Sequence, residues 1–158
     1  MTQTPITGPL SDTDEKTTGD ALQDSLVDLV GLALVAKQAH WNVIGRNFRS
    51  VHLQLDELVN LARTHADEVA ERAATIGRSP DGRPATVAGQ TGVPEYPGGW
   101  QKDERVIKAV VDTLEALIAR FRERVHQTEE SDPVTQDLLI TITSELEQAH
   151  WMWQAQLA

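Results

Sequence analysis

The stretch KQAHWNVIGRNFRSVHLQLDE (residues 37–57) and the stretch HADEVAERAATIG (residues 65–77) decide the fold of this chain. In both stretches, and in the residues that precede them from about Asp20 onward, apolar residues recur at the three- and four-residue spacing of an amphipathic helix. Gly45 interrupts this pattern and predicts the end of one helix, and the next helix continues to Gly77, a length of about eight turns. The two stretches therefore predict two long helices that run antiparallel and are joined by a tight turn.

A long connection separates this helical pair from a second one. Residues 77–99 hold six of the ten glycines and four of the seven prolines, so they cannot form one regular element, although PATVAGQ within them can supply a short helix. Apolar spacing then predicts a third helix beyond Trp100 and a fourth that starts at Pro133, with Ser131 or Asp132 as its cap. No strand-like alternation of useful length is present in the sequence.

Four helices with a long crossover in the middle predict an all-α fold, a ferritin-like four-helix bundle whose crossover carries a short helix. A helical cytokine-like bundle is also compatible with this pattern alone. Residues 1–17 contain two prolines and almost nothing to bury, which predicts a flexible N-terminal tail. Residues 18–158 then form a single domain, the usual arrangement for a chain of 158 residues.

Composition narrows the chemistry that this chain can perform. The sequence has no cysteine, which excludes disulfides, thiolate metal sites and cysteine nucleophiles. It carries 24 acidic and 14 basic residues, and the resulting net charge of −10 disfavours nonspecific binding to phosphate and favours the attraction of cations. No secretory signal and no apolar window of membrane-spanning length are present, so we expect a cytoplasmic protein without a membrane partner.

Two pairs of possible metal ligands, one histidine with a carboxylate and one of two carboxylates, lie along one stripe of the second predicted helix. His52 and Asp56 are four residues apart, and so are Asp67 and Glu71, which places each pair on one helical face where it could hold a metal ion. Eleven residues, close to three whole turns, separate Asp56 from Asp67, so all four side chains fall within an arc of roughly 100°. The alternative is that these polar residues are simply solvated or form ordinary surface ion pairs.

One helix cannot bring both pairs to the same ion, because eleven residues rise about 16 Å. If the same helix of a second subunit lay antiparallel across it, with a two-fold axis near Leu61 and Ala62, the His52 end of each helix would face the Glu71 end of the other. His40 precedes the turn by about as much as His52 follows it, so the two imidazoles should reach the same level. The spacing thus predicts two equivalent, shared sites with nitrogen and oxygen ligands, suited to iron, manganese or zinc, with redox chemistry favouring iron.

The same segments resemble the Dps family of mini-ferritins. The family signature is a histidine, eleven residues, a second histidine, three residues, an aspartate, ten residues, a second aspartate, three residues and a glutamate. His40, His52, Asp56, Asp67 and Glu71 fill it without a gap. The similarity runs from about residue 20 to the C-terminus and is most specific between residues 37 and 77.

The resemblance implies a homododecameric, hollow cage. Such a cage oxidises Fe(II) to Fe(III) at ferroxidase centres between subunits, usually with hydrogen peroxide, and deposits ferric mineral inside. The five signature residues would be both the metal ligands and the catalytic residues of each centre. These implied properties make the chain a ferroxidase and iron store that protects against oxidative stress.

The resemblance also implies roles for residues outside the signature. Acidic residues near the start of the last helix line cation pores on a three-fold axis in the family, which makes Glu130, Asp132 and Asp137 candidates. Their alternative role is to interact with the helix dipole. Trp41 matches a family tryptophan that lies beside the site, and the alternative is that it is an ordinary core tryptophan. His65 matches a histidine found in some members, which could bind an accessory ion or could simply be a hydrogen-bonded helix residue.

Three other functions stay open on the sequence alone. A nucleoid-compacting, DNA-binding protein with little catalysis is one, but residues 1–17 contain one lysine, no arginine and three acids, so DNA binding by a tail is not expected at physiological salt. A metal-dependent hydrolase that uses the same ligands to activate water is the second. A purely structural bundle is the third. Glu147 and His150 form one E-x-x-H motif, whereas a bundle di-iron site needs two copies, so we do not assign them a metal.

Overall fold

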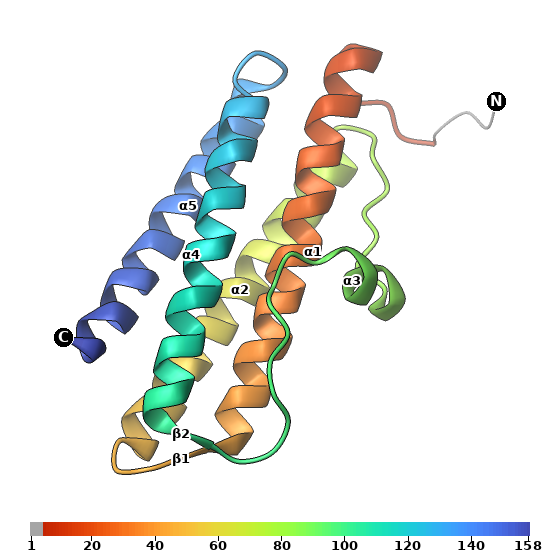
Figure 1. The fold of residues 1–158 in the computed structure, drawn as a ribbon. Helices are drawn as coiled ribbons and strands as arrows, with labels where there is room; N and C mark the ends of the chain where they lie inside the picture. The colour runs from red at the N-terminus through yellow and green to blue at the C-terminus, as the bar shows by residue number, and fades with distance from the viewer. Residues whose placement is uncertain (1–4) are drawn as a thin grey trace.

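A computed structural model of the chain, in which residues 5–158 are described, shows a bundle of four long helices (Figure 1). The helical pair α1 and α2 packs beside the pair α4 and α5, and the short helix α3 lies against α1 on the outside of the bundle. In chain order the elements are α1 (Asp12–Asn42), β1 (Val43–Ile44), α2 (Phe48–Thr75), α3 (Pro84–Gln90), β2 (Gln101–Lys102), α4 (Asp103–Gln127), α5 (Pro133–Gln154) and a final 3-10 turn, η1 (Ala155–Leu157). The predicted fold class, with its short helix in the crossover, is confirmed.

The four long helices bury their apolar stripes against one another in a single core. This core contains Leu22, Leu55, Phe121, Leu146 and Trp153, each with at most 1% of its surface exposed. Removal of such side chains from water is the main favourable contribution to folding. Among residues 5–158, no helix is both long and apolar enough to cross a membrane.

The first helix starts earlier than the apolar pattern predicts. It begins at Asp12 instead of about Asp20, because the Ser11 hydroxyl caps it by accepting a hydrogen bond from the Asp14 amide at 3.2 Å. Acidic residues in its first turn also suit the positive end of the helix dipole. The predicted tail boundary at residue 17 is therefore wrong, since residues 12–17 are helical, and residues 1–4 of that tail lie outside the described part of the chain.

A two-residue strand pair, too short to leave a pattern in the sequence, fixes the turn between α1 and α2. β1 pairs in parallel with β2, so the end of the crossover is hydrogen-bonded to this turn. The buried Asp103 carboxylate accepts the Asn47 amide at 2.7 Å. Gly45 has a φ of 137°, and a side chain there would overlap the Asp103 carboxylate. Together these contacts fix the position of the end of α1 relative to the start of α2.

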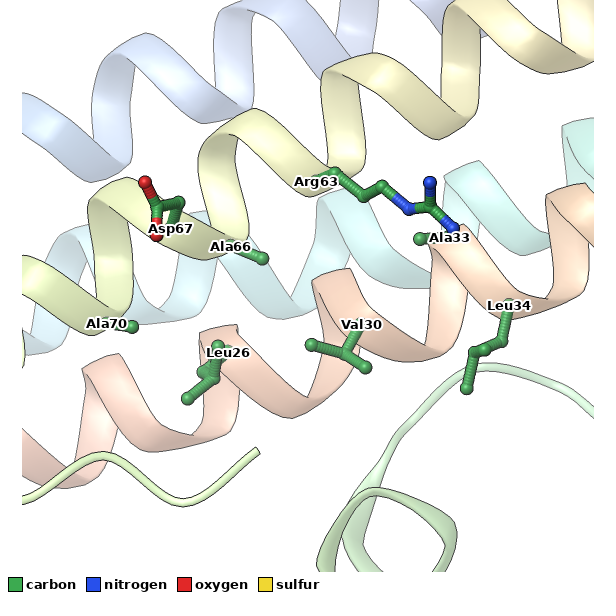
Figure 2. A pocket seen from close by; sticks show the side chains of 8 residues that line it. All are labelled: Leu26, Val30, Ala33, Leu34, Arg63, Ala66, Asp67 and Ala70. Atoms are coloured by element: carbon green, nitrogen blue, oxygen red, sulfur yellow. The ribbon is translucent and has the colours of Figure 1, made fainter. Parts of the chain in front are cut away.

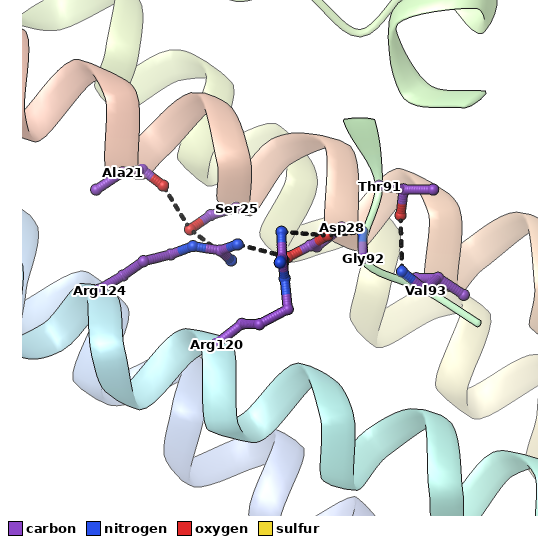
Figure 3. A network of polar contacts seen from close by, with 8 residues as sticks. All are labelled: Ala21, Ser25, Asp28, Thr91, Gly92, Val93, Arg120 and Arg124. Carbon is purple, nitrogen blue, oxygen red and sulfur yellow. Dashed lines mark hydrogen bonds and ion pairs between the residues drawn. The ribbon is translucent and has the colours of Figure 1, made fainter. Parts of the chain in front are cut away.

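A buried ionic cluster anchors the crossover over α1 (Figure 3). The Asp28 carboxylate is fully buried and accepts hydrogen bonds from the Gly92 amide at 2.6 Å, from Arg120 Nε at 2.8 Å and from Arg124 Nη2 at 2.6 Å. Arg124 also reaches the Ser25 hydroxyl at 3.4 Å. Three segments, α1, α4 and the crossover, therefore converge on one carboxylate.

Candidate metal centre

The two predicted histidines face each other across the helical pair. His40 near the end of α1 and His52 in the second turn of α2 stack with ring centroids 3.6 Å apart and an interplanar angle of 21°. Each ring donates from Nδ1 to the backbone carbonyl of the other residue at 2.8 Å. The imidazoles thus lie at the same level, as their spacing around the turn predicts.

These reciprocal hydrogen bonds determine which ring nitrogens can bind a metal. A carbonyl oxygen only accepts, so the proton of each neutral imidazole must sit on Nδ1, and Nε2 keeps its lone pair. Backbone hydrogen bonds of this kind are the usual way in which proteins orient metal-binding histidines. His40 and His52 are therefore held in the tautomer that suits a ligand.

Asp56, the predicted carboxylate ligand on α2, lies beside the histidine pair. Its Oδ1 lies 3.5 Å from His40 Nδ1 and accepts a hydrogen bond from Lys37 Nζ at 2.5 Å. The Lys37 hydrogen bond lowers the pKa of Asp56 below its ordinary value of 3.8, against a smaller opposing effect of desolvation. This carboxylate is therefore ionised at neutral pH and has a bound cationic side chain.

Asp67 and Glu71 lie at the other end of α2, as the spacing requires, and are exposed. Within residues 5–158 neither carboxylate makes an ion pair or a side-chain hydrogen bond with another residue. Asp67 lines a largely apolar cavity of about 450 Å³ between α1 and α2, together with Leu26, Val30 and Arg63 (Figure 2). Among the described residues of this single chain, no group of three or more potential ligands is arranged to hold a metal ion.

His40, His52 and Asp56 are thus neighbours without forming a metal site by themselves, and Asp67 and Glu71 lie apart from them. The α1–α2 face that carries both ends also exposes large apolar side chains. Leu34 is 59% exposed and Leu53 is 49% exposed. An open cavity and exposed apolar residues on one face are typical of a surface that binds another protein.

Comparison with known proteins shows the family of this chain. A family model described as the ferritin-like domain matches residues 19–158. The DNA protection during starvation protein of Mycolicibacterium smegmatis is 38% identical over 157 residues, which cover 99% of this chain and 85% of that protein. The chain belongs to the Dps family.

Two further relatives support the assignment to the Dps family. DNA protection during starvation protein 2 of Deinococcus radiodurans is 37% identical over 142 residues, which cover 90% of this chain but only 59% of that longer protein. The structure of Dps from Microbacterium arborescens in the high iron form superposes with a TM-score of 0.90 at 30% identity, covering 96% of this chain and 98% of that one. The Dps fold is therefore present over nearly the whole chain.

The residues predicted to surround the Dps site differ in how well they fit that role. Trp41 follows His40 and is 63% exposed, so it is not a core tryptophan and stays a candidate neighbour of the site. His65 is buried between two carboxylates, with Nδ1 2.7 Å from Glu68 and Nε2 2.9 Å from Glu145. Among residues 5–158, His65 makes no hydrogen bond or ion pair with a predicted ligand, which favours a role in packing α2 against α5, and its place near the site stays a prediction.

One of the three predicted pore residues is used inside the subunit. Asp132 is buried, caps α5 by accepting the Val134 amide, and accepts hydrogen bonds from Thr135 Oγ1 at 2.5 Å and Arg72 Nη2 at 2.6 Å. These contacts give Asp132 a structural role within the subunit, and its place at a pore stays a prediction. Glu130 and Asp137 are exposed and remain pore predictions.

Two ion pairs connect α5 and the residue before it to the neighbouring helices. The role of Arg72 as the partner of Asp132 has no signature in the sequence, because the two residues are far apart along the chain. Glu147 of the E-x-x-H motif pairs with Arg122 of α4 at 2.6 Å, which agrees with leaving it out of the metal site. His150 Nε2 is buried without a hydrogen-bond partner in the part of the chain described.

The Asp132 cluster gives a testable dependence of stability on pH. Burial raises the pKa of Asp132, but the hydrogen bonds from Thr135 and Arg72 outweigh it, so the pKa lies below its ordinary value of 3.8. A lowered folded-state pKa stabilises the fold above about pH 4, and this contribution is lost as the pH falls through the folded-state value. We expect Asp132→Asn, which keeps a good cap, to lose about 1–3 kcal/mol at pH 7 and roughly 3–10 °C in Tm.

Calorimetric melting of both proteins between pH 7 and pH 2 tests this expectation. The Tm of Asp132→Asn should fall less steeply below pH 4 than that of the unmodified protein. Asp137→Asn is the matched control, because Asp137 is on the same helix but exposed, and it should change the Tm by less than about 2 °C. Equal pH profiles for Asp132→Asn and the unmodified protein would show that this cluster does not set acid stability.

Proposed function

We propose that this chain is a ferroxidase and iron-storage subunit whose catalytic centres form only between two copies. In each centre, His40, His52 and Asp56 of one subunit would meet Asp67 and Glu71 of the partner. The observation that carries this proposal is a division within one chain. At one end of α2 lies an oriented histidine pair, and at the other lie the Asp67 and Glu71 carboxylates; within residues 5–158, neither the histidine Nε2 atoms nor these carboxylates have a hydrogen-bond or ion-pair partner. An antiparallel, two-fold contact of the α1–α2 faces would bring the two halves together twice.

The donor set suits iron as the substrate. Imidazole nitrogens and carboxylate oxygens bind Fe(II) well, and no thiolate is available to favour softer metals. The related Microbacterium arborescens structure is described as a high iron form, which supports the same cargo here. The net charge of −10 on each subunit would attract Fe(II) to a closed shell of twelve copies, the assembly that we infer from the family.

The chemistry balances when hydrogen peroxide is the oxidant. Two Fe(II) ions each lose one electron, and both electrons reduce one peroxide molecule, whose O–O bond breaks. Both oxygens end as oxide or hydroxide on Fe(III), and hydrolysis of Fe(III) by water releases protons as the mineral grows. The side chains supply placement and negative charge, and no proton-abstracting residue is needed.

Consumption of Fe(II) and peroxide also gives a route to the DNA protection for which the relatives are named. A two-electron reduction of peroxide forms no hydroxyl radical, which is the species that damages nucleic acid. We therefore place the protein in the cytoplasm near DNA and attribute its protective effect to this reaction instead of to DNA binding.

Peroxide-driven oxidation of Fe(II), followed by the absorbance of the ferric product and by size-exclusion chromatography, tests the proposal. We expect rapid oxidation, with ferric iron eluting together with the assembled protein. His52→Ala combined with Asp56→Ala should slow the fast phase by about 10–100-fold or more without changing the assembled size. Asp112→Ala, which removes an exposed carboxylate from α4, serves as the control and should oxidise Fe(II) at the normal rate. Normal oxidation by the double variant would disprove this assignment.

A further inference from the structure

Lys37 contacts the one carboxylate that this chain adds to its histidine pair. It lies on α1 one turn before His40, and its side chain is 24% exposed. Its ammonium group donates to Asp56 Oδ1, the same oxygen that lies 3.5 Å from His40 Nδ1. A positively charged side chain is therefore already bound to one oxygen of the Asp56 carboxylate.

This ion pair changes the charge of the histidine end of the centre, which consists of His40, His52 and Asp56. The charges of Asp56 and Lys37 cancel, so this ion pair offers no net negative charge to an approaching cation. The other half differs, because Asp67 and Glu71 have no ion-pair partner among residues 5–158, and Arg63, which shares the cavity with Asp67, makes no ion pair there. Attraction of a cation thus depends on the partner's end of α2, whereas the histidine end resists it.

The ion pair contributes little to holding α1 against α2. The two helices share a continuous apolar core along their length, and a partly exposed ion pair adds only a small amount to such packing. Lysine also differs from arginine in having a compact charge on a flexible stem, so it can leave a carboxylate without breaking a bidentate contact. Lys37 is therefore suited to move.

We propose that Lys37 is a positioning residue that competes with the divalent cation for Asp56. This inference rests on the proposed function. Before an ion binds, the ammonium orients Asp56 beside the histidines and neutralises it, and it must withdraw when the ion arrives. Lys37 thereby weakens binding at the histidine end and sets a limit on how long the centre holds its substrate, which has to move on to the mineral.

Calorimetric titration of the assembled protein with Zn²⁺, which undergoes no redox reaction, measures this competition directly. We expect Lys37→Met, which keeps the length of the stem and removes the charge, to lower the Kd for Zn²⁺ about tenfold. Lys37→Arg keeps the charge and can hold Asp56 through a bidentate contact, so its Kd should stay at or above that of the unmodified protein. Lys108→Met is the matched control, because Lys108 pairs with Asp112 on the exposed side of α4, and it should leave the Kd unchanged.

Size-exclusion chromatography and thermal melting confirm assembly of each variant, and Lys37→Gln replaces Lys37→Met if that variant does not assemble. An unchanged or raised Kd in the uncharged variant would overturn the role of Lys37 while the proposed function stands. Zn²⁺ binding that does not depend on His52 and Asp56 in the unmodified protein would instead overturn the proposed function. The two failures are therefore distinguishable.

Discussion

Cages assembled from equal amounts of two inactive variants should regain about a quarter of their ferroxidase centres. One variant carries His52→Ala and Asp56→Ala, and the other carries Asp67→Ala. In a random mixture, half of the two-fold pairs contain one subunit of each kind. Each such pair has one centre with both halves intact and one centre with both halves lost. The initial rate of Fe(II) oxidation with peroxide should therefore rise to about a quarter of the normal rate.

The controls for this experiment follow from which half of the centre each residue occupies. Mixing the His52→Ala/Asp56→Ala variant with His40→Ala should restore nothing, because both variants damage the histidine end. Native mass spectrometry shows whether the cages contain both kinds of subunit. Verified mixed cages without any recovery would contradict ligation across subunits and would indicate a centre that each chain builds alone.

The fold follows from the sequence where local spacing determines it. The apolar stripes of α1, α2, α4 and α5 predict four helices, and the glycines and prolines of residues 77–99 predict the crossover. The stacked pair His40 and His52 is also predictable, because equal distances from a tight turn bring two residues of a helical hairpin to the same level. In both cases the information lies in residues that are close together along the chain.

The remaining features depend on contacts between distant parts of the chain. Lys37 pairs with Asp56, and Arg72 pairs with Asp132, although nothing in the spacing links these residues. The β1–β2 pair has only two residues in each strand, so it shows no alternation. The early start of α1 depends on the Ser11 cap instead of apolar spacing. The arrangement of Asp67 and Glu71 relative to a second subunit lies beyond one chain and stays a prediction.

Asp28 also makes contacts between distant parts of the chain, and we expect its replacement to lower the stability of the fold strongly. Its carboxylate is the counter-ion of the buried Arg124 and of Arg120, and it also holds the amide of Gly92 in the crossover. Burial lowers the pKa of Arg124, and the Asp28 charge opposes that effect. Asp28→Ala leaves the Arg124 guanidinium buried without a counter-ion and releases the crossover, so we expect the free energy of unfolding to fall by about 3–5 kcal/mol.

Denaturant unfolding measures this loss, and limited proteolysis shows where it acts. Cleavage should become faster between residues 88 and 100, the segment that Gly92 fastens to α1. Asp20→Asn is the matched control, because Asp20 is also an ion-paired acid on α1 but has 47% of its side chain exposed, and it should cost at most about 1 kcal/mol. Asp28→Leu combined with Arg124→Met should be less damaging than Asp28→Ala, since it removes the buried charge together with its partner. If Asp28→Ala costs no more than Asp20→Asn, the cluster does not hold the crossover, and other contacts must do so, such as the β1–β2 pair and the hydrogen bonds between Gln23 and Asp81.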